Sequence, residues 1–170
     1  LVKDLHARSS GTGGFTLWGE TALPILHDLN GSAGQDFYGF AKGEASFVQF
    51  KVKEGDDASC LNLNRIANPQ LLGVQQDELA RRGAFSFAAV ADDVDAEHLW
   101  HALAMSYEND VIPGIADQTV IIWGLGKSVG DTLTYVDENG GEFHIRLIGG
   151  LANSIFQGNV IIAEDHFIDK

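Results

Sequence analysis

The stretch from residue 129 to residue 162 constrains the fold most, because it carries the clearest strand pattern in the chain. Its apolar residues recur at every second position in two runs: Leu133 and Tyr135, then Phe143, Ile145 and Leu147. A period of two with aromatic and β-branched residues is typical of half-buried strands. Between the runs, Asn139-Gly140 predicts a tight hairpin turn in which both residues have positive φ angles.

A third apolar run at residues 160–162 follows a loop rich in Asn, Ser, Gln and Gly. We therefore expect a hairpin and a third strand, which together make an antiparallel C-terminal meander. A sheet with an apolar face must be covered by helices or by a second sheet.

The rest of the chain mixes strand and helix signals. Alternating or β-rich segments predict strands at residues 15–19, 45–53, 61–65 and 85–90, with extended chain at 111–113. Residues 34–43 fit a short helix or an irregular loop, and residues 117–123 fit a strand by propensity or a short helix capped by an Asp.

Two longer helices are expected. Residues 69–82 carry a run of leucines and end in two arginines followed by Gly83, the usual close of a helix. A second helix is capped by Asp93 or Asp95 and runs to Met105. Its buried stripe consists of Leu99, Ala102 and Leu103.

The predicted fold class is α+β, with a mixed sheet, covering helices and two closely associated subdomains within a single domain, residues 1–170. The chain has 170 residues, of which 45% are hydrophobic, enough for such a core. Its formal net charge of −13 would repel nucleic acid and anionic lipid surfaces, so we expect no nucleic-acid partner.

Cys60 is the single cysteine, which excludes an internal disulfide framework. The sequence has no apolar run near 18 residues and no signal peptide. It opens with Leu1 instead of Met and stops at Lys170 directly after an expected strand. We therefore expect a fragment of a longer polypeptide.

Residues 124–130 contain a G-x-G-x-x-x-G pattern after an apolar run, which in a dinucleotide-binding fold would hold phosphate at the start of a helix. The context contradicts that reading, because a strand hairpin follows and no βαβ unit surrounds the glycines. A turn that leads into a strand is the better interpretation of Gly130-Asp131.

Three further groups of residues could carry chemistry, and each has a simpler explanation. The pair His98 and His101 could bind a metal, but a solvated helix surface accounts for it. Cys60 could be a nucleophile with His27 or His144, but a free cysteine is usually a small buried hydrophobe. The acidic residues Glu54, Asp56 and Asp57 lack the register of a calcium loop and fit a solvated turn.

Several phrases spread over nearly the whole chain resemble the extracytoplasmic, MacB-like periplasmic domain of FtsX-like ABC transporter permeases. The first half contributes Gly13-Gly14-Phe15, residues 19–25 with 28–30, residues 55–64, Pro69 with Leu72-Gly73-Val74, and residues 83–87. The second half contributes Ala116-Asp117, Trp123, residues 129–133, residues 147–151, residues 154–158 and Phe167. Residues 92–108 match least.

The resemblance implies a bacterial inner-membrane protein in which this domain lies between two transmembrane helices, on the periplasmic side. Its partners would be a cytoplasmic ABC ATPase, which uses the ATP, and a second permease subunit, and they could include an extracytoplasmic protein. The domain would transmit helix motion across the membrane, a role called mechanotransmission. The family carries no catalytic, cofactor-binding or metal-binding residues in this domain. The resemblance also favours a helix at residues 117–123.

Two other functions remain open on the sequence. The first is a free-standing exported ligand-binding or accessory domain. The second is an enzyme that uses Cys60 or the pair His98 and His101.

Overall fold

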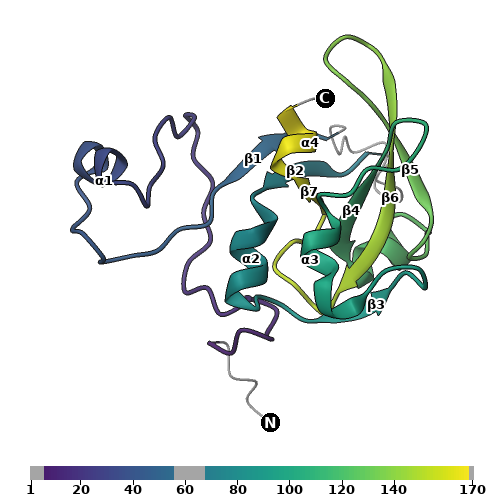
Figure 1. The fold of residues 1–170 in the computed structure, drawn as a ribbon, viewed down its shortest axis with the longest axis horizontal. Coiled ribbons are helices and arrows are strands. Elements are labelled where there is room, and N and C mark those ends of the chain that lie inside the picture. Colours follow the sequence, from purple (N-terminus) through teal and green to yellow (C-terminus); the bar gives the residue numbers. More distant parts are fainter. Residues whose placement is uncertain (1–5, 56–67, 169–170) are drawn as a thin grey trace.

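The structure is a computed structural model that describes residues 6–55 and 68–168. Its strands form one seven-stranded mixed sheet, which confirms the α+β class (Figure 1). The strands are β1 (Phe50–Lys53), β2 (Gln70–Val74), β3 (Phe87–Val90), β4 (Val111–Asp117), β5 (Thr132–Val136), β6 (Glu142–Leu151) and β7 (Asn159–Ala163). The helices are α1 (Ser32–Tyr38), α2 (Gln76–Arg82), the 3-10 helix η1 (Ala96–His98), α3 (Leu99–Ala102), the π-helix η2 (Val120–Gly124) and α4 (Glu164–Ile168).

The strand order is β1-β2-β7-β4-β6-β3, and β5 pairs with the first half of β6. The pairs β2–β7 and β4–β6 are parallel, and the remaining pairs are antiparallel. Strand β6 is ten residues long, so it can hold β5 at its beginning and β3 at its end.

The predicted hairpin is confirmed as β5 and β6, with Val136 opposite Glu142. Its turn differs in detail from the expectation, since Gly140 has a positive φ of 81° but Asn139 does not. The Asp137 carboxylate instead accepts hydrogen bonds from the backbone N–H groups of Asn139 and Gly141, at 2.8 and 2.7 Å. The side chain thus supplies the turn chemistry that two left-handed residues were expected to supply.

The third strand of the expected meander is present as β7, but it does not pair with β6. Strand β4 lies between them and pairs with both. Its residues from Val111 to Asp117 are almost wholly buried, because hydrophobic clusters cover both faces of the sheet at this central position. The meander is therefore wrong beyond its first hairpin.

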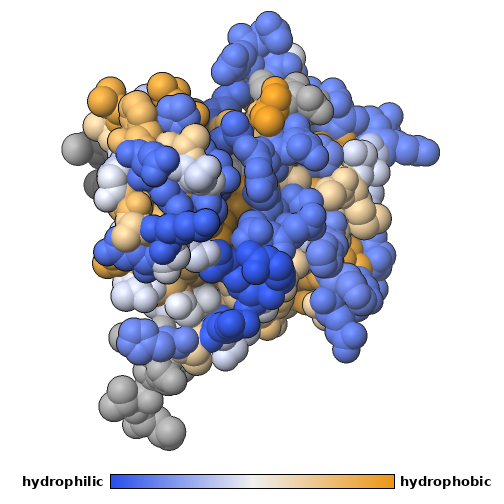
Figure 2. All heavy atoms as spheres, turned by 60° about the vertical axis from the view of Figure 1, so that its left-hand side comes forward, coloured by the Kyte–Doolittle hydropathy of each residue, from blue (hydrophilic) through white to orange (hydrophobic). Residues whose placement is uncertain are grey.

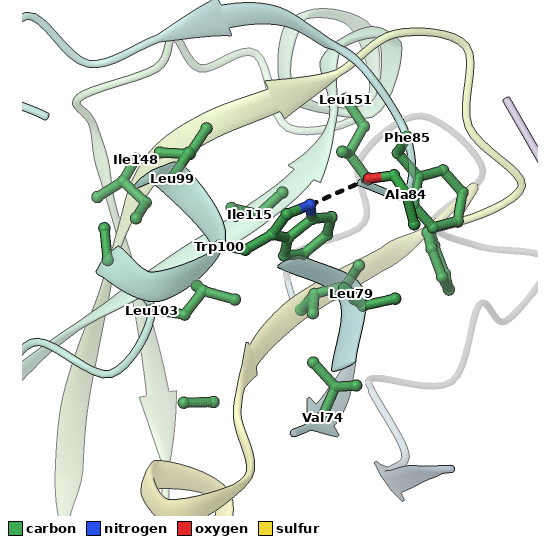
Figure 3. Packing of buried hydrophobic residues seen from close by; sticks show 14 of the residues in the cluster. Val74, Leu79, Ala84, Phe85, Leu99, Trp100, Leu103, Ile115, Ile148 and Leu151 are labelled. Atoms are coloured by element: carbon green, nitrogen blue, oxygen red, sulfur yellow. Dashed lines mark hydrogen bonds between the residues drawn. The ribbon is translucent and has the colours of Figure 1, made fainter. Parts of the chain in front are cut away.

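Two hydrophobic clusters cover the two faces of the sheet, and neighbouring residues of one strand alternate between them. In β7, Ile161 belongs to one cluster and Val160 and Ile162 to the other. Helices α2 and α3 close the first cluster, where the indole N–H of Trp100 donates a 3.0 Å hydrogen bond to the Ala84 carbonyl (Figure 3).

The expected helix over residues 69–82 is wrong in its first half. Residues 70–74 form β2, and only Gln76–Arg82 is helical, closed at Gly83 as predicted. Strand β2 is buried from Leu71 to Val74, with a parallel neighbour on one side. A strand buried on both faces shows no alternation, and its leucines therefore resembled a helix.

The strand expected at residues 15–19 does not form, and the one expected at 45–53 is reduced to its last four residues. The strand at 85–90 is confirmed as β3 from Phe87, and residues 111–113 open β4. The strand expected at 61–65 lies outside the described residues.

The helix expected after residue 93 is present but shorter, as η1 followed by α3. Asp95 is its cap and accepts a 3.0 Å hydrogen bond from the Glu97 backbone N–H. Leu99, Ala102 and Leu103 are buried as expected. Residues 120–124 are helical, which confirms the helical interpretation of that segment.

Candidate functional site

A shallow hollow of about 240 Å³ lies beside α3, and it contains the predicted histidine pair. The Nδ1 atom of His98 lies 2.8 Å from an Asp95 carboxylate oxygen, and Nδ1 of His101 lies 3.0 Å from Asp77. A carboxylate only accepts hydrogen bonds, so each Nδ1 carries the proton. The two ring centroids are 6.3 Å apart.

Each charged or ionisable side chain that lines the hollow and takes part in these pairs already has a partner, either within the hollow or next to it. Asp93 forms a bidentate pair with Arg146, at 2.7 and 2.8 Å, which lowers the pKa of Asp93. Among the described residues, no group of three or more His, Cys, Asp or Glu side chains is placed to hold a metal ion. The solvated helix surface remains the interpretation of His98 and His101.

A titration tests the Asp95–His98 pair. The hydrogen bond to Asp95 raises the pKa of His98 above its ordinary 6.5, and the same bond lowers the pKa of Asp95 below 3.8. The pair therefore stabilises the fold fully between these two ordinary values. Its contribution is lost as the pH rises through the folded pKa of His98, or falls through that of Asp95. Asp95→Asn should return the His98 pKa toward its ordinary value in an NMR titration.

Asp77→Asn is the matched control, because Asp77 contacts the other histidine of the hollow. It should leave the pKa of His98 raised. Equal His98 pKa values in the wild type and in Asp95→Asn would contradict the pairing.

The remaining sequence candidates do not gather into one site in the described part of the chain. Cys60, Asp56 and Asp57 lie outside the described residues. The His27 ring lies tilted against Phe37, with centroids 4.7 Å apart, and His144 on β6 contacts the Thr134 hydroxyl at 3.1 Å.

The glycine pattern at residues 124–130 is a turn into β5, as interpreted from the sequence. Gly126 and Gly130 have φ angles of 62° and 101°. The Asp131 carboxylate accepts a 2.8 Å hydrogen bond from the Ser128 backbone N–H, which closes the turn before β5 begins.

Asp117 is a buried carboxylate whose long-range contact the sequence did not reveal. One of its oxygens accepts a hydrogen bond from the Thr119 N–H at 2.9 Å, the cap expected at this position. The other accepts from the Ser154 N–H at 2.5 Å and from the Ser154 hydroxyl at 2.9 Å. The first oxygen thus caps the helix that follows β4, and the second joins the end of β4 to the loop before β7, which are both structural roles.

The most exposed apolar surface belongs to residues 17–47, here named the aromatic arm. The arm includes α1 and projects from the sheet (Figure 1). Between residues 16 and 46, only Leu29 and Gly34 are buried. Figure 2 brings this side of the molecule forward and shows apolar side chains gathered toward its upper left. The large apolar side chains exposed on the arm are Leu17, Trp18, Leu23, Ile25, Leu26, Phe37, Tyr38 and Phe40.

The arm is internally ordered by a polar clamp. The Asn30 side chain donates to the Phe47 carbonyl at 3.0 Å and accepts from the Phe47 N–H at 2.8 Å. The Gln49 side chain accepts from the Leu29 N–H at 3.0 Å. These bonds tie the middle of the arm, at residues 29 and 30, to the chain at residues 47 and 49, as strand partners would, without a strand.

Trp18 fixes the base of the arm to the body. Its ring lies edge-on to Phe156 at 5.2 Å and to Phe50 of β1 at 5.4 Å. Phe156 is fully buried and also contacts Phe85, so the arm is joined to the hydrophobic cluster under α2 and α3. The sequence signal for the arm was three aromatic residues among residues 37–40, but it did not reveal that they face solvent.

Comparisons with protein-family models, with curated proteins and with solved structures find no match to this chain. No helix in residues 6–55 and 68–168 is long and apolar enough to cross a membrane.

Proposed function

We propose that this chain is the extracytoplasmic domain of an FtsX/MacB-like ABC transporter permease. It performs no reaction and couples ATP hydrolysis by a cytoplasmic partner ATPase to movement, or to engagement of a partner, outside the membrane. The phrases that resemble the permease family are the starting point of the proposal.

One observation carries the proposal: the phrases that resemble the family contact one another in the fold. Asp117 binds Ser154 through two hydrogen bonds, and a Cβ added at Gly13 or Gly73 would meet a ring of another phrase at 2.6 Å. Three such pairs lie far apart in sequence: Gly13 with Phe85, Gly73 with Phe167, and Asp117 with Ser154.

The architecture also suits the transmission of force. A seven-stranded sheet packed on both faces is stiff, because close-packed interiors resist compression. The aromatic arm is joined to this sheet through Trp18 and β1. A load placed on the arm therefore reaches the sheet directly.

The test uses the complete protein that contains this chain, produced together with its ATPase. With Cys60→Ser and Asn139→Cys at the exposed hairpin tip, a membrane-impermeant maleimide should label the protein from the extracytoplasmic side. The protein should sediment with membranes and co-purify with an ATP-hydrolysing subunit. Spin labels at Asn139→Cys of two copies should change their separation when hydrolysis is trapped with vanadate.

Recovery of the complete protein in the soluble fraction, without an ATPase, would overturn the proposal. A label separation that is the same with and without trapped nucleotide would remove the coupling role.

A further inference from the structure

We infer that the aromatic arm is the docking surface for a partner protein that presents an apolar groove bordered by basic side chains. The inference rests on the proposed function, because it names the surface through which the domain engages a protein outside the membrane. The arm, as defined above, comprises residues 17–47.

Several large apolar side chains of the aromatic arm are exposed to water. Leu23 and Leu26 are each 79% exposed, and Phe37 is 67% exposed. Soluble proteins rarely leave several large apolar side chains together in water unless another molecule covers them. Aromatic and large aliphatic side chains are also the groups that dominate the centres of protein interfaces.

The second step is pre-organisation. The rings of the arm follow one another from His27 to Phe37 at 4.7 Å, Phe37 to Tyr38 at 4.9 Å, Tyr38 to Phe40 at 6.5 Å, and Phe40 to Phe47 at 5.1 Å. The Tyr38 hydroxyl accepts a 3.2 Å hydrogen bond from the Leu26 N–H, and the Asn30 side chain holds the middle of the arm against Phe47 at its C-terminal end. Side chains that are already ordered lose less entropy on binding, so the exposed rings are suited to recognition.

The negative charge of the aromatic arm indicates the chemistry of the partner protein. The arm carries four carboxylates, those of Glu20, Asp28, Asp36 and Glu44, and one cation, Lys42, so its net charge is −3. None of the ion pairs among the described residues involves these carboxylates. Asp28 and Glu44 each accept a hydrogen bond from a backbone N–H of the arm through one oxygen, but no cation among the described residues balances the four charges, which therefore attract cationic groups of a partner.

The same charge argues against two other occupants. A symmetric contact with a second copy would bring eight carboxylates and two lysines together, and like charges at an interface disfavour association. An anionic lipid surface would repel both the arm and the chain, whose net charge is −13. A protein with a basic border around an apolar groove satisfies both the rings and the carboxylates.

The closing experiment places the photocrosslinker p-benzoylphenylalanine at Phe37 of the complete protein in its own cells. The exposed strand residue Thr134 is the control position. Position 37 should yield an adduct with one protein, which mass spectrometry identifies, and position 134 should not. The identified protein is then purified, and its affinity for the chain is measured by calorimetry.

Phe37→Ser with Leu26→Ser should weaken that affinity by about thirtyfold or more, as expected for two central contacts. Asp36→Lys should slow association, and added salt should weaken binding to the wild type. An unchanged melting temperature shows that the variants are folded, since the altered side chains are exposed.

Several results overturn the inference. They are an adduct with a second copy, an adduct with lipid alone, no adduct, or an identified protein that binds the double serine variant as tightly as the wild type. Dimerisation in analytical ultracentrifugation that the double serine variant abolishes, or co-sedimentation with phosphatidylglycerol vesicles, does the same. Failure of the permease proposal is distinguishable, because the protein would then be soluble while position 37 could still crosslink.

Discussion

Phe156→Ala is expected to lower the free energy of unfolding by about 3–5 kcal/mol, the cost of emptying a fully buried aromatic site. The Phe156 ring lies between 5.2 and 5.4 Å from three other rings, those of Trp18, Phe50 and Phe85. Alanine removes the common partner of all three. Urea unfolding measures the change, and Phe156→Leu should lose less, about 1–2 kcal/mol, because it keeps most of the apolar volume.

The same variant should also release the aromatic arm. Trp18 loses the Phe156 contact and keeps only Phe50 among its ring contacts. Chymotrypsin should therefore cleave the arm near Tyr38 faster in Phe156→Ala than in the wild type, at a urea concentration where both remain folded. Phe37→Ala is the control, since Phe37 is exposed and its loss should change stability by less than about 0.5 kcal/mol. Equal losses of stability in the two alanine variants would contradict the anchoring role of Phe156.

Local sequence patterns were sufficient to predict the elements that face water on one side. Strand β5 alternates between exposed and buried positions along its whole length, and the Asp and Gly residues of the following turn act within five residues. Sequence periodicity therefore predicted the hairpin. Gly83 likewise ends α2 in the left-handed conformation, with a φ of 57°.

The same patterns failed where the burial of a segment, or its pairing with another strand, depends on residues far away in the sequence. Strand β2 is buried on both faces because each face belongs to a hydrophobic cluster, and both clusters include residues of β7, about 90 residues later in the chain. The segment at residues 15–19 alternates as a strand should, yet no strand pairs with it, and Trp18 packs on Phe50 and Phe156 instead. Whether a segment pairs with another strand depends on the tertiary structure, and the alternation of apolar and polar residues alone does not determine it.

The aromatic arm shows the same limit for function. The sequence predicts a short helix or an irregular loop at residues 34–43 and does not indicate that Phe37 and Phe40 face solvent, because phenylalanine is usually buried. Only the fold shows that the chain from residue 17 to residue 47 leaves the sheet and returns to it at β1 (Figure 1). The contact between Asp95 and His98 was closer to prediction, because the two residues lie three positions apart at the start of the expected helix. The contact between His101 and Asp77 of α2 depended instead on the packing of α2 against α3.

Asp117→Ala is expected to cost about 3–5 kcal/mol, because three donors lose a buried, charged acceptor at once. Asp117 is fully buried, so water does not readily replace its carboxylate. The contact spans 37 residues and holds the loop before β7 against the end of β4. Urea unfolding with an unchanged m-value would show that the loss lies in the folded state.

Asp117→Asn separates the geometry of the side chain from its acceptor capacity. The carboxylate uses one oxygen for Thr119 and the other for Ser154, whereas an amide has only one oxygen. Its NH₂ group must then face a backbone N–H, so asparagine should cost nearly as much as alanine. Ser154→Ala should cost less, about 1–2 kcal/mol, because the Ser154 N–H keeps its acceptor, while the bond from the hydroxyl to Asp117 and the long bond from the Phe156 N–H to the hydroxyl are lost. Asparagine as stable as the wild type would mean that Asp117 stabilises the junction through one oxygen alone.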